Sequence, residues 1–153
     1  MTALPGFFMN MDTISNKLPK AERLNSKNII DKLFAKSNSF VVYPLRVVYT
    51  ELEEQEQKVP ASLFVSVSKR KFRHAVDRNY MKRRIREAYR LNKSIHLPVI
   101  QEKGLHLAIA FIYLDKETRE FENIDRKMKD ALAQIATRIS QPAQQVEQET
   151  AQQ

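Results

Sequence analysis

The sequence predicts an α+β fold, a small α-β sandwich in which helices pack on a mixed sheet. Two observations support this class. Three segments rich in β-branched and aromatic residues alternate with three in which apolar residues recur every three or four positions. Apolar residues also make up 42% of a 153-residue chain, which is enough to bury one core. The predicted order is α-β-β-α-β-α, over residues 24–36, 39–50, 59–68, 77–93, 105–114 and from 115–118 onward.

Both terminal helices are predicted from apolar residues at helical spacing. The first helix can be capped by Asn25 or Ser26, whose side chains accept hydrogen bonds from the free amides of the first turn. The apolar stripes of both helices are best explained by packing into the core. Their members are Ile29, Ile30, Leu33 and Phe34 in the first helix, and Phe121, Ile124, Met128, Leu132, Ile135 and Ile139 in the last.

The strands are predicted from their composition and from the residues that bound them. The strands at 39–50 and 59–68 are expected to form a hairpin around the polar loop 51–58. Pro44 cannot donate to a β-ladder, so it marks an edge, a bend or the true start of the first strand. The strand at 105–114 is apolar enough to lie at the centre of the sheet.

The helix after the second strand is expected to begin at Asp77, whose carboxylate would cap it. At about 100° per residue, its side chains divide into two arcs. One arc is basic and faces solvent, with Glu87 placed to hold Arg83 and Arg90. The other arc is apolar and faces the core; it comprises Met81, Ile85, Ala88 and Tyr89.

The excess charge of the chain lies in residues 69–93, which hold eleven Lys or Arg and two acids. This segment has a net charge of +9, whereas the whole chain carries +8, so the remainder is close to neutral. Most charged helix faces are simply solvated, but such faces mix signs and this one hardly does. A single basic surface predicts binding to a polyanion. Nucleic acid is favoured over a membrane because no long Lys-rich helix carries a large exposed apolar face.

Composition excludes several other classes. The chain has no Cys, so it holds no disulfide or thiolate metal site, and no apolar run reaches the length of a membrane span. Its two Gly cannot build a phosphate-cradling loop, and its three His are scattered. The acids of residues 51–58 are better explained as solubilising groups than as metal ligands. We therefore expect no catalytic or metal centre in the protein itself.

The two ends of the chain are expected to lie outside the fold. Residues 1–16 show no periodicity and no secretory signal, and we expect a flexible leader before one domain at 17–140. The Gln-rich residues 141–153 are expected to be disordered. The absence of Cys fits a reducing cytoplasm, which is the expected location.

Residues 66–89, SVSKRKFRHAVDRNYMKRRIREAY, resemble the protein component of bacterial ribonuclease P. The match is to the RNR motif of that family, which follows a strand ending Ser-Val-Ser-Lys-Arg. The resemblance extends from about residue 20 to residue 140. Its landmarks are Arg23-Leu24 before the first helix, Val47-Val48-Tyr49 in the first strand, and Arg78-Asn79, Lys82-Arg83 and Arg86-Glu87 in the motif.

The resemblance implies an α-β sandwich with an unusual left-handed β-α-β crossover. It also implies that the protein binds the catalytic RNA of ribonuclease P in a 1:1 complex and helps it remove the 5′ leader from precursor tRNA. In this family the RNA performs the Mg²⁺-dependent hydrolysis, and a cleft between the first helix and the sheet receives the leader. Neither DNA nor a membrane is an expected partner.

Site residues are carried over from the family position by position. The leader cleft is expected to include Phe34, Tyr49 and Ile30, of which the two rings can stack on unpaired bases. Core packing is the alternative for both rings, and Ile30 stands where an aromatic is common. The connection 71–74 lacks glycine and is one residue longer than in many relatives. The expected RNA contacts are Lys69, Arg70, Arg73, Arg78, Asn79, Lys82, Arg83, Arg86 and Arg90.

Three other classes remain open from sequence. A ribosomal-type protein that binds structured RNA would share the sandwich but have no role in cleavage. A DNA-binding regulator would need a dimerisation stripe, and none is left over once the helices are packed. A protein-only nuclease would need clustered carboxylates, whereas the acids here lie mainly in a loop and on helix surfaces.

Overall fold

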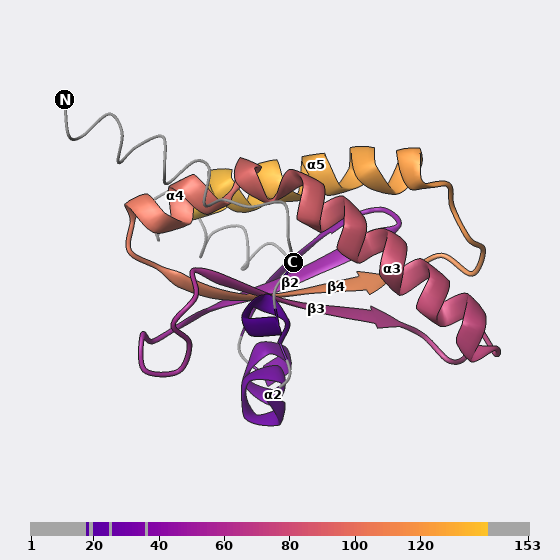
Figure 1. The fold of residues 1–153 in the computed structure, drawn as a ribbon, viewed down its shortest axis with the longest axis horizontal. Helices are drawn as coiled ribbons and strands as arrows, with labels where there is room; N and C mark the ends of the chain where they lie inside the picture. The colour runs from indigo at the N-terminus through magenta and orange to yellow at the C-terminus, as the bar shows by residue number, and fades with distance from the viewer. Residues whose placement is uncertain (1–17, 19, 25, 36, 141–153) are drawn as a thin grey trace.

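A four-stranded sheet with helices on both faces forms the protein, so the predicted α+β class is confirmed (Figure 1). A computed structural model describes residues 18, 20–24, 26–35 and 37–140; the expected leader and tail lie outside them. The strands are β1 (Asn38–Val42), β2 (Leu45–Leu52), β3 (Ala61–Val67) and β4 (His106–Tyr113). The helices are α2 (Lys27–Ala35), α3 (Ala75–Asn92), α4 (Leu97–Glu102) and α5 (Phe121–Ser140), with short 3-10 turns η1 (Lys20–Glu22) and η2 (Lys93–Ile95).

Strand β4 lies at the centre, as its apolar sequence predicts, and the sheet order is β1-β2-β4-β3. It pairs antiparallel with β2 and parallel with β3. The predicted hairpin around 51–58 is therefore wrong, because β4 lies between β2 and β3. The hairpin is formed by β1 and β2 instead, which divide the predicted strand 39–50 at the cis peptide Tyr43–Pro44. The bend expected at Pro44 is confirmed.

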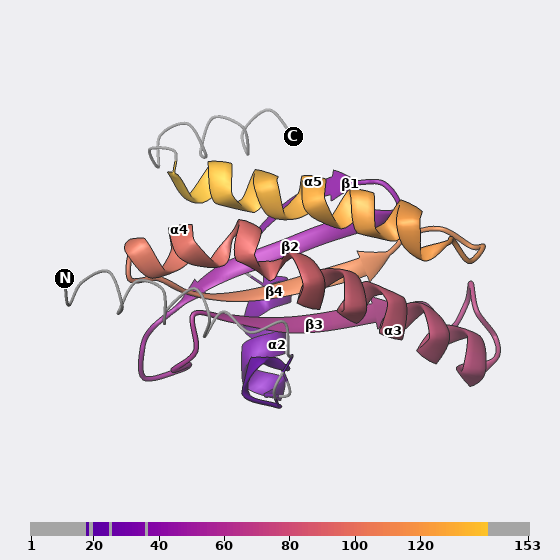
Figure 2. The ribbon, with the colours of Figure 1, turned by 45° about the horizontal axis from the view of Figure 1, so that its top comes forward.

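The connection from β3 to its parallel neighbour β4 passes through α3, η2 and α4. In Figure 2 both strands point to the right, β4 lies above β3, and the connecting helices lie in front of the sheet. This arrangement is a left-handed crossover, as the family resemblance implies. Right-handed crossovers dominate among proteins, so periodicity and composition could not have predicted this hand.

Each face of the sheet buries its own core. Helices α3, α4 and α5 cover one face and α2 covers the other (Figure 1). Alternate residues of β4 point to opposite faces. Leu107 and Ile109 join the core under α3 and α5, whereas Ala108 and Ala110 join the smaller core under α2. None of the described helices has the length and hydropathy that crossing a membrane requires.

The starts of α2 and α3 test the predicted caps. The amide of Ile29 lies 3.5 Å from the Ser26 hydroxyl, a long hydrogen bond that supports Ser26 as the cap of α2; Asn25 lies outside the described residues. The prediction for α3 is wrong. His74 occupies its N-cap position, and Asp77 lies within the first turn, where a carboxylate is still favourable near the positive end of the helix dipole.

Two more segments differ from prediction. Residues 97–104, expected to be a connection, contain α4, which has Pro98 in its first turn and ends before Gly104 at φ 66°. The last helix begins at Phe121 rather than at 115–118. The preceding residues form a loop in which Arg119 donates to the Asp115 carboxylate at 2.8 Å.

A histidine is buried where α3 meets η2 and α4. His96 has no exposed surface, and its Nε2 lies 3.3 Å from the Tyr89 hydroxyl. Its Nδ1 has no hydrogen-bond partner among the described residues. Burial lowers the pKa of His96 to about 4, because the charged imidazolium would lose its water, and the positive charge of Lys93 acts in the same direction.

We expect His96 to make stability depend on pH. The side chain titrates near 6.5 when unfolded and near 4 when folded, so between these values only the unfolded chain binds the proton. Acidification from pH 7.5 to 5 should therefore cost about 2 kcal/mol of the free energy of unfolding. Denaturant titration of the wild type and His96→Gln checks this expectation. The loss should be smaller by about that amount in the variant, and equal losses would contradict it.

Candidate nucleic-acid interface

Helix α3 turns its basic residues to solvent because its apolar arc is fixed in the core. Met81, Ile85 and Ala88 have no exposed surface, and neither has Tyr89, so the predicted apolar arc is confirmed. The helix packs against α5 and β3. The opposite side of α3 is consequently held outward by the same contacts that stabilise the fold.

The outward side carries the basic strip, defined as Arg78, Asn79, Lys82, Arg83, Arg86 and Arg90. Asn79 and Arg83 are exposed, and the other four are partly exposed. Glu87 accepts a hydrogen bond from Arg90 Nε at 3.0 Å, and this contact lowers the pKa of the Glu87 carboxyl. The predicted pair between Glu87 and Arg83 is absent from the described side chains. Arg83 therefore keeps its charge directed at solvent.

Arg78 also holds the loop that precedes α3. Its guanidinium donates to the carbonyls of Phe72 at 2.8 Å and Arg73 at 3.0 Å. Phe72 is buried, with its ring centroid 5.9 Å from that of Tyr113. The connection 71–74 is therefore held by its backbone carbonyls, through Arg78, and by the Phe72 side chain. The loop presents three exposed cations that were predicted to contact RNA, Lys69, Arg70 and Arg73.

The segment before α2 is attached to the outer edge of β3. The Leu24 amide donates to the Leu63 carbonyl at 2.8 Å, in the manner of a parallel strand. Glu22 forms an ion pair with Lys93 at 3.1 Å, and both side chains are largely buried. Lys93, one of the cations counted in residues 69–93, therefore serves the fold.

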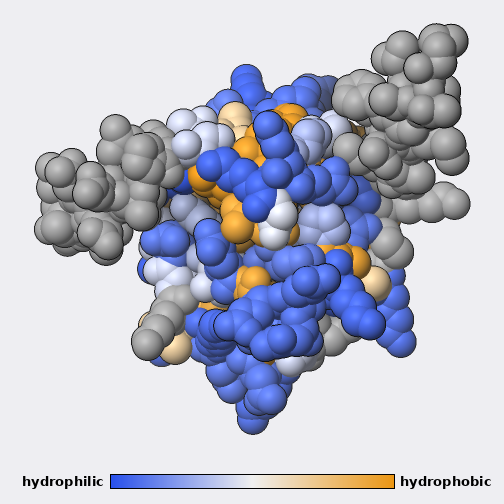
Figure 3. Space-filling model, turned by 90° about the vertical axis from the view of Figure 1, so that its left-hand side faces the viewer, coloured by the Kyte–Doolittle hydropathy of each residue, from blue (hydrophilic) through white to orange (hydrophobic). Residues whose placement is uncertain are grey.

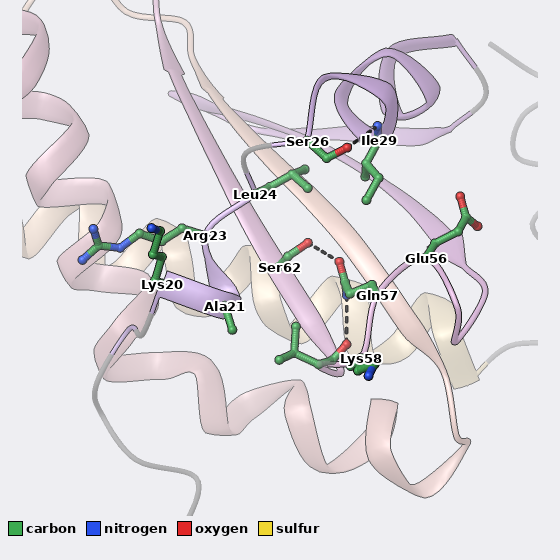
Figure 4. A pocket seen from close by; sticks show the side chains of 11 residues that line it. Lys20, Ala21, Arg23, Leu24, Ser26, Ile29, Glu56, Gln57, Lys58 and Ser62 are labelled. Atoms are coloured by element: carbon green, nitrogen blue, oxygen red, sulfur yellow. Dashed lines mark hydrogen bonds between the residues drawn. The ribbon is translucent and has the colours of Figure 1, made fainter.

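This attachment places more positive charge beside the basic strip. Arg86 is partly buried, and its pKa is lowered first by loss of water and then by the positive charge of Arg23. Arg23 and Lys20 are both exposed, and their side chains point to the same side in Figure 4. Like charges held together favour an anion between them. Sequence reasoning used Arg23 only as a landmark before the first helix, so it missed this extension of the basic surface.

On the α2 side, a hollow of about 540 Å³ lies between η1, the start of α2 and the loop before β3 (Figure 4). Glu56, the acid on its wall, is paired with Lys32 at 3.1 Å. Gln57 donates to the carbonyls of Val59 at 3.0 Å and Leu107 at 2.9 Å. The lining also includes cations, Lys20, Arg23 and Lys58, and apolar side chains, Leu24 and Ile29.

Two uncharged polar side chains of this hollow, Gln57 and Ser62, already form hydrogen bonds within the protein. The Gln57 carbonyl oxygen accepts a hydrogen bond of 2.5 Å from Ser62, and its amide donates to the two backbone carbonyls. No donor of either side chain is left to read the edge of a base. A ligand would be held by charge and by apolar contact, which carry little sequence information.

The expected cleft residues separate onto the two faces of the sheet. Phe34 is 49% exposed, and its ring meets Phe64 edge-on at 6.3 Å. Ile30 packs in the core under α2. A second hollow of about 270 Å³ lies beside Phe34, with Arg46 on its wall. Phe64 and Arg46 were not predicted, although strand alternation places both on the α2 face.

Tyr49 is not a cleft residue. It is 5% exposed and packs on Phe40 at 6.2 Å, in the core on the α5 side. Its neighbour Val48 faces α2 instead. Strand alternation is the reason, because a residue at an odd position of β2 cannot share the face of an even one. The core alternative holds for Tyr49.

Two further observations concern metal ligands and the hydropathy of the surface. No three His, Asp or Glu side chains gather into a metal-binding group within the described parts of the chain. Figure 3 views the end of the molecule at which α4 and the β2–β3 loop lie, and there the described surface is mainly hydrophilic with small apolar areas.

The sequence of this chain matches a known protein family. The sequence profile of the family described as Ribonuclease P matches residues 18–136. The ribonuclease P protein component of Porphyromonas gingivalis is 42% identical over 126 residues, which cover 82% of this chain and 91% of that protein. The same component from Chlorobaculum tepidum is 34% identical and covers 71% of this chain and 73% of its own length.

Solved structures share the fold. The RNase P protein of Staphylococcus aureus is 24% identical and superposes with a TM-score of 0.58, covering 76% of this chain and 96% of that chain. The RNase P protein of Thermotoga maritima is 21% identical, with a TM-score of 0.57 and coverage of 74% and 96%. These likenesses support the sandwich arrangement described above.

We expect Lys82→Ala with Arg83→Ala to weaken binding to a structured RNA and to flatten its salt dependence. Removing two phosphate contacts should reduce the log–log slope by about 1.5, since each contact contributes roughly 0.7 to 0.9. Filter binding at several salt concentrations measures both effects. The matched control is Arg126→Ala with Lys129→Ala, which removes two exposed cations from α5. Equal effects of the two pairs would contradict a localised interface.

Proposed function

The chain belongs to the ribonuclease P protein family, and on that premise we propose that it binds the RNA subunit of ribonuclease P and the 5′ leader of precursor tRNA. In this role it assists the endonucleolytic removal of the leader. We propose that it acts in the cytoplasm as a 1:1 complex with that RNA.

The basic strip carries the proposal. It presents arginine, lysine and asparagine side chains on a helix whose other side is buried, so packing sets the positions on the helix from which these donors project. Arg83 and Lys82 have no acidic partner among the described residues, and the exposed loop cations Lys69 and Arg70 extend the surface. Such contacts supply affinity through phosphates and depend steeply on salt.

The α2 face is the proposed leader site. It offers an exposed ring at Phe34, where an unpaired base can stack, and a hollow lined with cations. The donors of Gln57 and Ser62 are used internally, so base edges would meet no free donor from these two side chains. This arrangement suits a subunit that accepts leaders of many sequences.

The hydrolysis is assigned to the RNA subunit in this proposal. Phosphodiester hydrolysis assisted by Mg²⁺ needs oxygen ligands grouped around the metal. In this proposal Mg²⁺ is bound by the RNA, as the family resemblance implies. The residues of this chain would bind and orient the two RNA molecules.

Reconstitution tests the proposal. Purified protein, ribonuclease P RNA from the same source and precursor tRNA are combined at a magnesium concentration where the RNA alone is nearly inactive. We expect cleavage at the mature 5′ end only when both subunits are present. RNA binding that is salt-sensitive but gives no gain in cleavage would contradict this function and favour a ribosomal-type RNA-binding protein.

A further inference from the structure

Two exposed tyrosines lie near the end of the molecule where β4 finishes, and the basic strip does not include them. Tyr43 is 51% exposed and Tyr80 is 44% exposed. A guanidinium lies over each ring: Arg84 is 4.2 Å from the centroid of Tyr80, and Arg119 is 5.1 Å from that of Tyr43. An arginine on one face of a ring is a favourable cation–π contact that also orients the ring.

The two pairs are joined by hydrogen bonds. Arg84 donates to the Tyr80 hydroxyl and to the backbone carbonyl of Arg119. Arg119 in turn donates to Asp115 at 2.8 Å and to Asn123 at 3.0 Å. We call Tyr80, Arg84, Arg119 and Tyr43 the aromatic platform. Its members come from α3, the loop before α5 and the β1–β2 turn.

The loop that carries Arg119 is held at several points. The Tyr113 hydroxyl donates to the Glu117 carbonyl at 2.6 Å, and the Leu114 amide donates to the Pro44 carbonyl at 2.7 Å. Lys71 donates to the Leu114 carbonyl. The rings are thus positioned before a ligand arrives, and binding would lose little conformational entropy.

A hollow of about 310 Å³ connects the platform to the basic strip. It is lined by Tyr80, Arg83, Arg84, Glu87 and Phe121. Arg83 belongs to the basic strip and also lines this hollow beside Tyr80, so an RNA backbone that follows the basic strip passes beside an exposed ring.

We propose that the aromatic platform stacks unpaired bases of the ribonuclease P RNA subunit. The inference rests on the function proposed above and adds a second kind of contact to it. Stacking on tyrosine is tolerant of base identity and needs no charge. The RNA subunit is the partner because the platform adjoins the basic strip on the α3 and α5 side, whereas the proposed leader site lies on the α2 side.

The test replaces both rings while leaving every charge in place. Tyr43→Leu with Tyr80→Leu should weaken binding to the RNA subunit by about tenfold or more, with an unchanged slope against salt concentration. Tyr43→Phe with Tyr80→Phe should bind almost like the wild type, since stacking needs only the ring. Leu91→Ala is the matched control, because Leu91 is an apolar residue on α3 that is 41% exposed.

Several results would overturn the inference. One is that the Tyr→Leu pair binds the RNA subunit as tightly as the wild type does. Another is that the Tyr→Phe pair loses as much affinity as the Tyr→Leu pair. A third is that the salt dependence of the Tyr→Leu pair is weaker than that of the wild type. A loss confined to leader-bearing precursor tRNA on the assembled enzyme would move the platform to the leader. Thermal melts of each variant verify the fold. Wild-type protein that fails to bind the RNA subunit would instead remove the proposed function.

Discussion

The parallel pairing of β3 with β4 is the constraint on which the rest of the structure depends. Parallel neighbours cannot be joined by a tight turn, so the chain must cross the sheet between them, and α3 makes that crossing. Met81 and Ile85 then fix the rotation of α3 by entering the core. The basic strip faces outward as a consequence. The charge that we propose to bind RNA is therefore positioned by packing on the opposite side of the same helix.

The sheet also separates two kinds of surface. On one side lie cations in a fixed pattern, with the aromatic platform beside them. On the other side lie Phe34 and two hollows, whose linings include cations and apolar side chains. Glu22 and Lys93 connect the sides, because their ion pair holds η1 against the end of α3 and so brings Arg23 near Arg86. Breaking one member would leave a buried charge without its partner, which is costly.

Much of the fold could be predicted from sequence because local pattern dictates it. The apolar arc of α3 and the central place of β4 followed from periodicity and composition. Strand pairing did not, because the sequences of β2 and β3 are equally compatible with a hairpin; only tertiary contacts place β4 between them. The hand of the crossover came from family resemblance alone.

Some residues of the candidate site could be predicted from sequence and others could not, for a similar reason. Residues on one helix, such as Lys82 and Arg83, share a face by spacing. Tyr49 was carried over to the cleft by its position in the family, whereas the alternation of β2 turns its side chain into the core on the α5 side. Arg23 gained its significance from Arg86, which is distant in sequence, and Tyr80 from Arg84, whose guanidinium also donates to the distant Arg119 carbonyl.

The most direct measurement compares precursor tRNA with leaderless tRNA on enzyme assembled with wild-type or Phe34→Ala protein. If the two faces bind different RNA molecules, the variant should lose about tenfold in affinity for the leader-bearing substrate alone. Its affinity for the RNA subunit should stay unchanged. An equal loss for both tRNA forms, or weaker binding to the RNA subunit, would contradict the separation of the two faces.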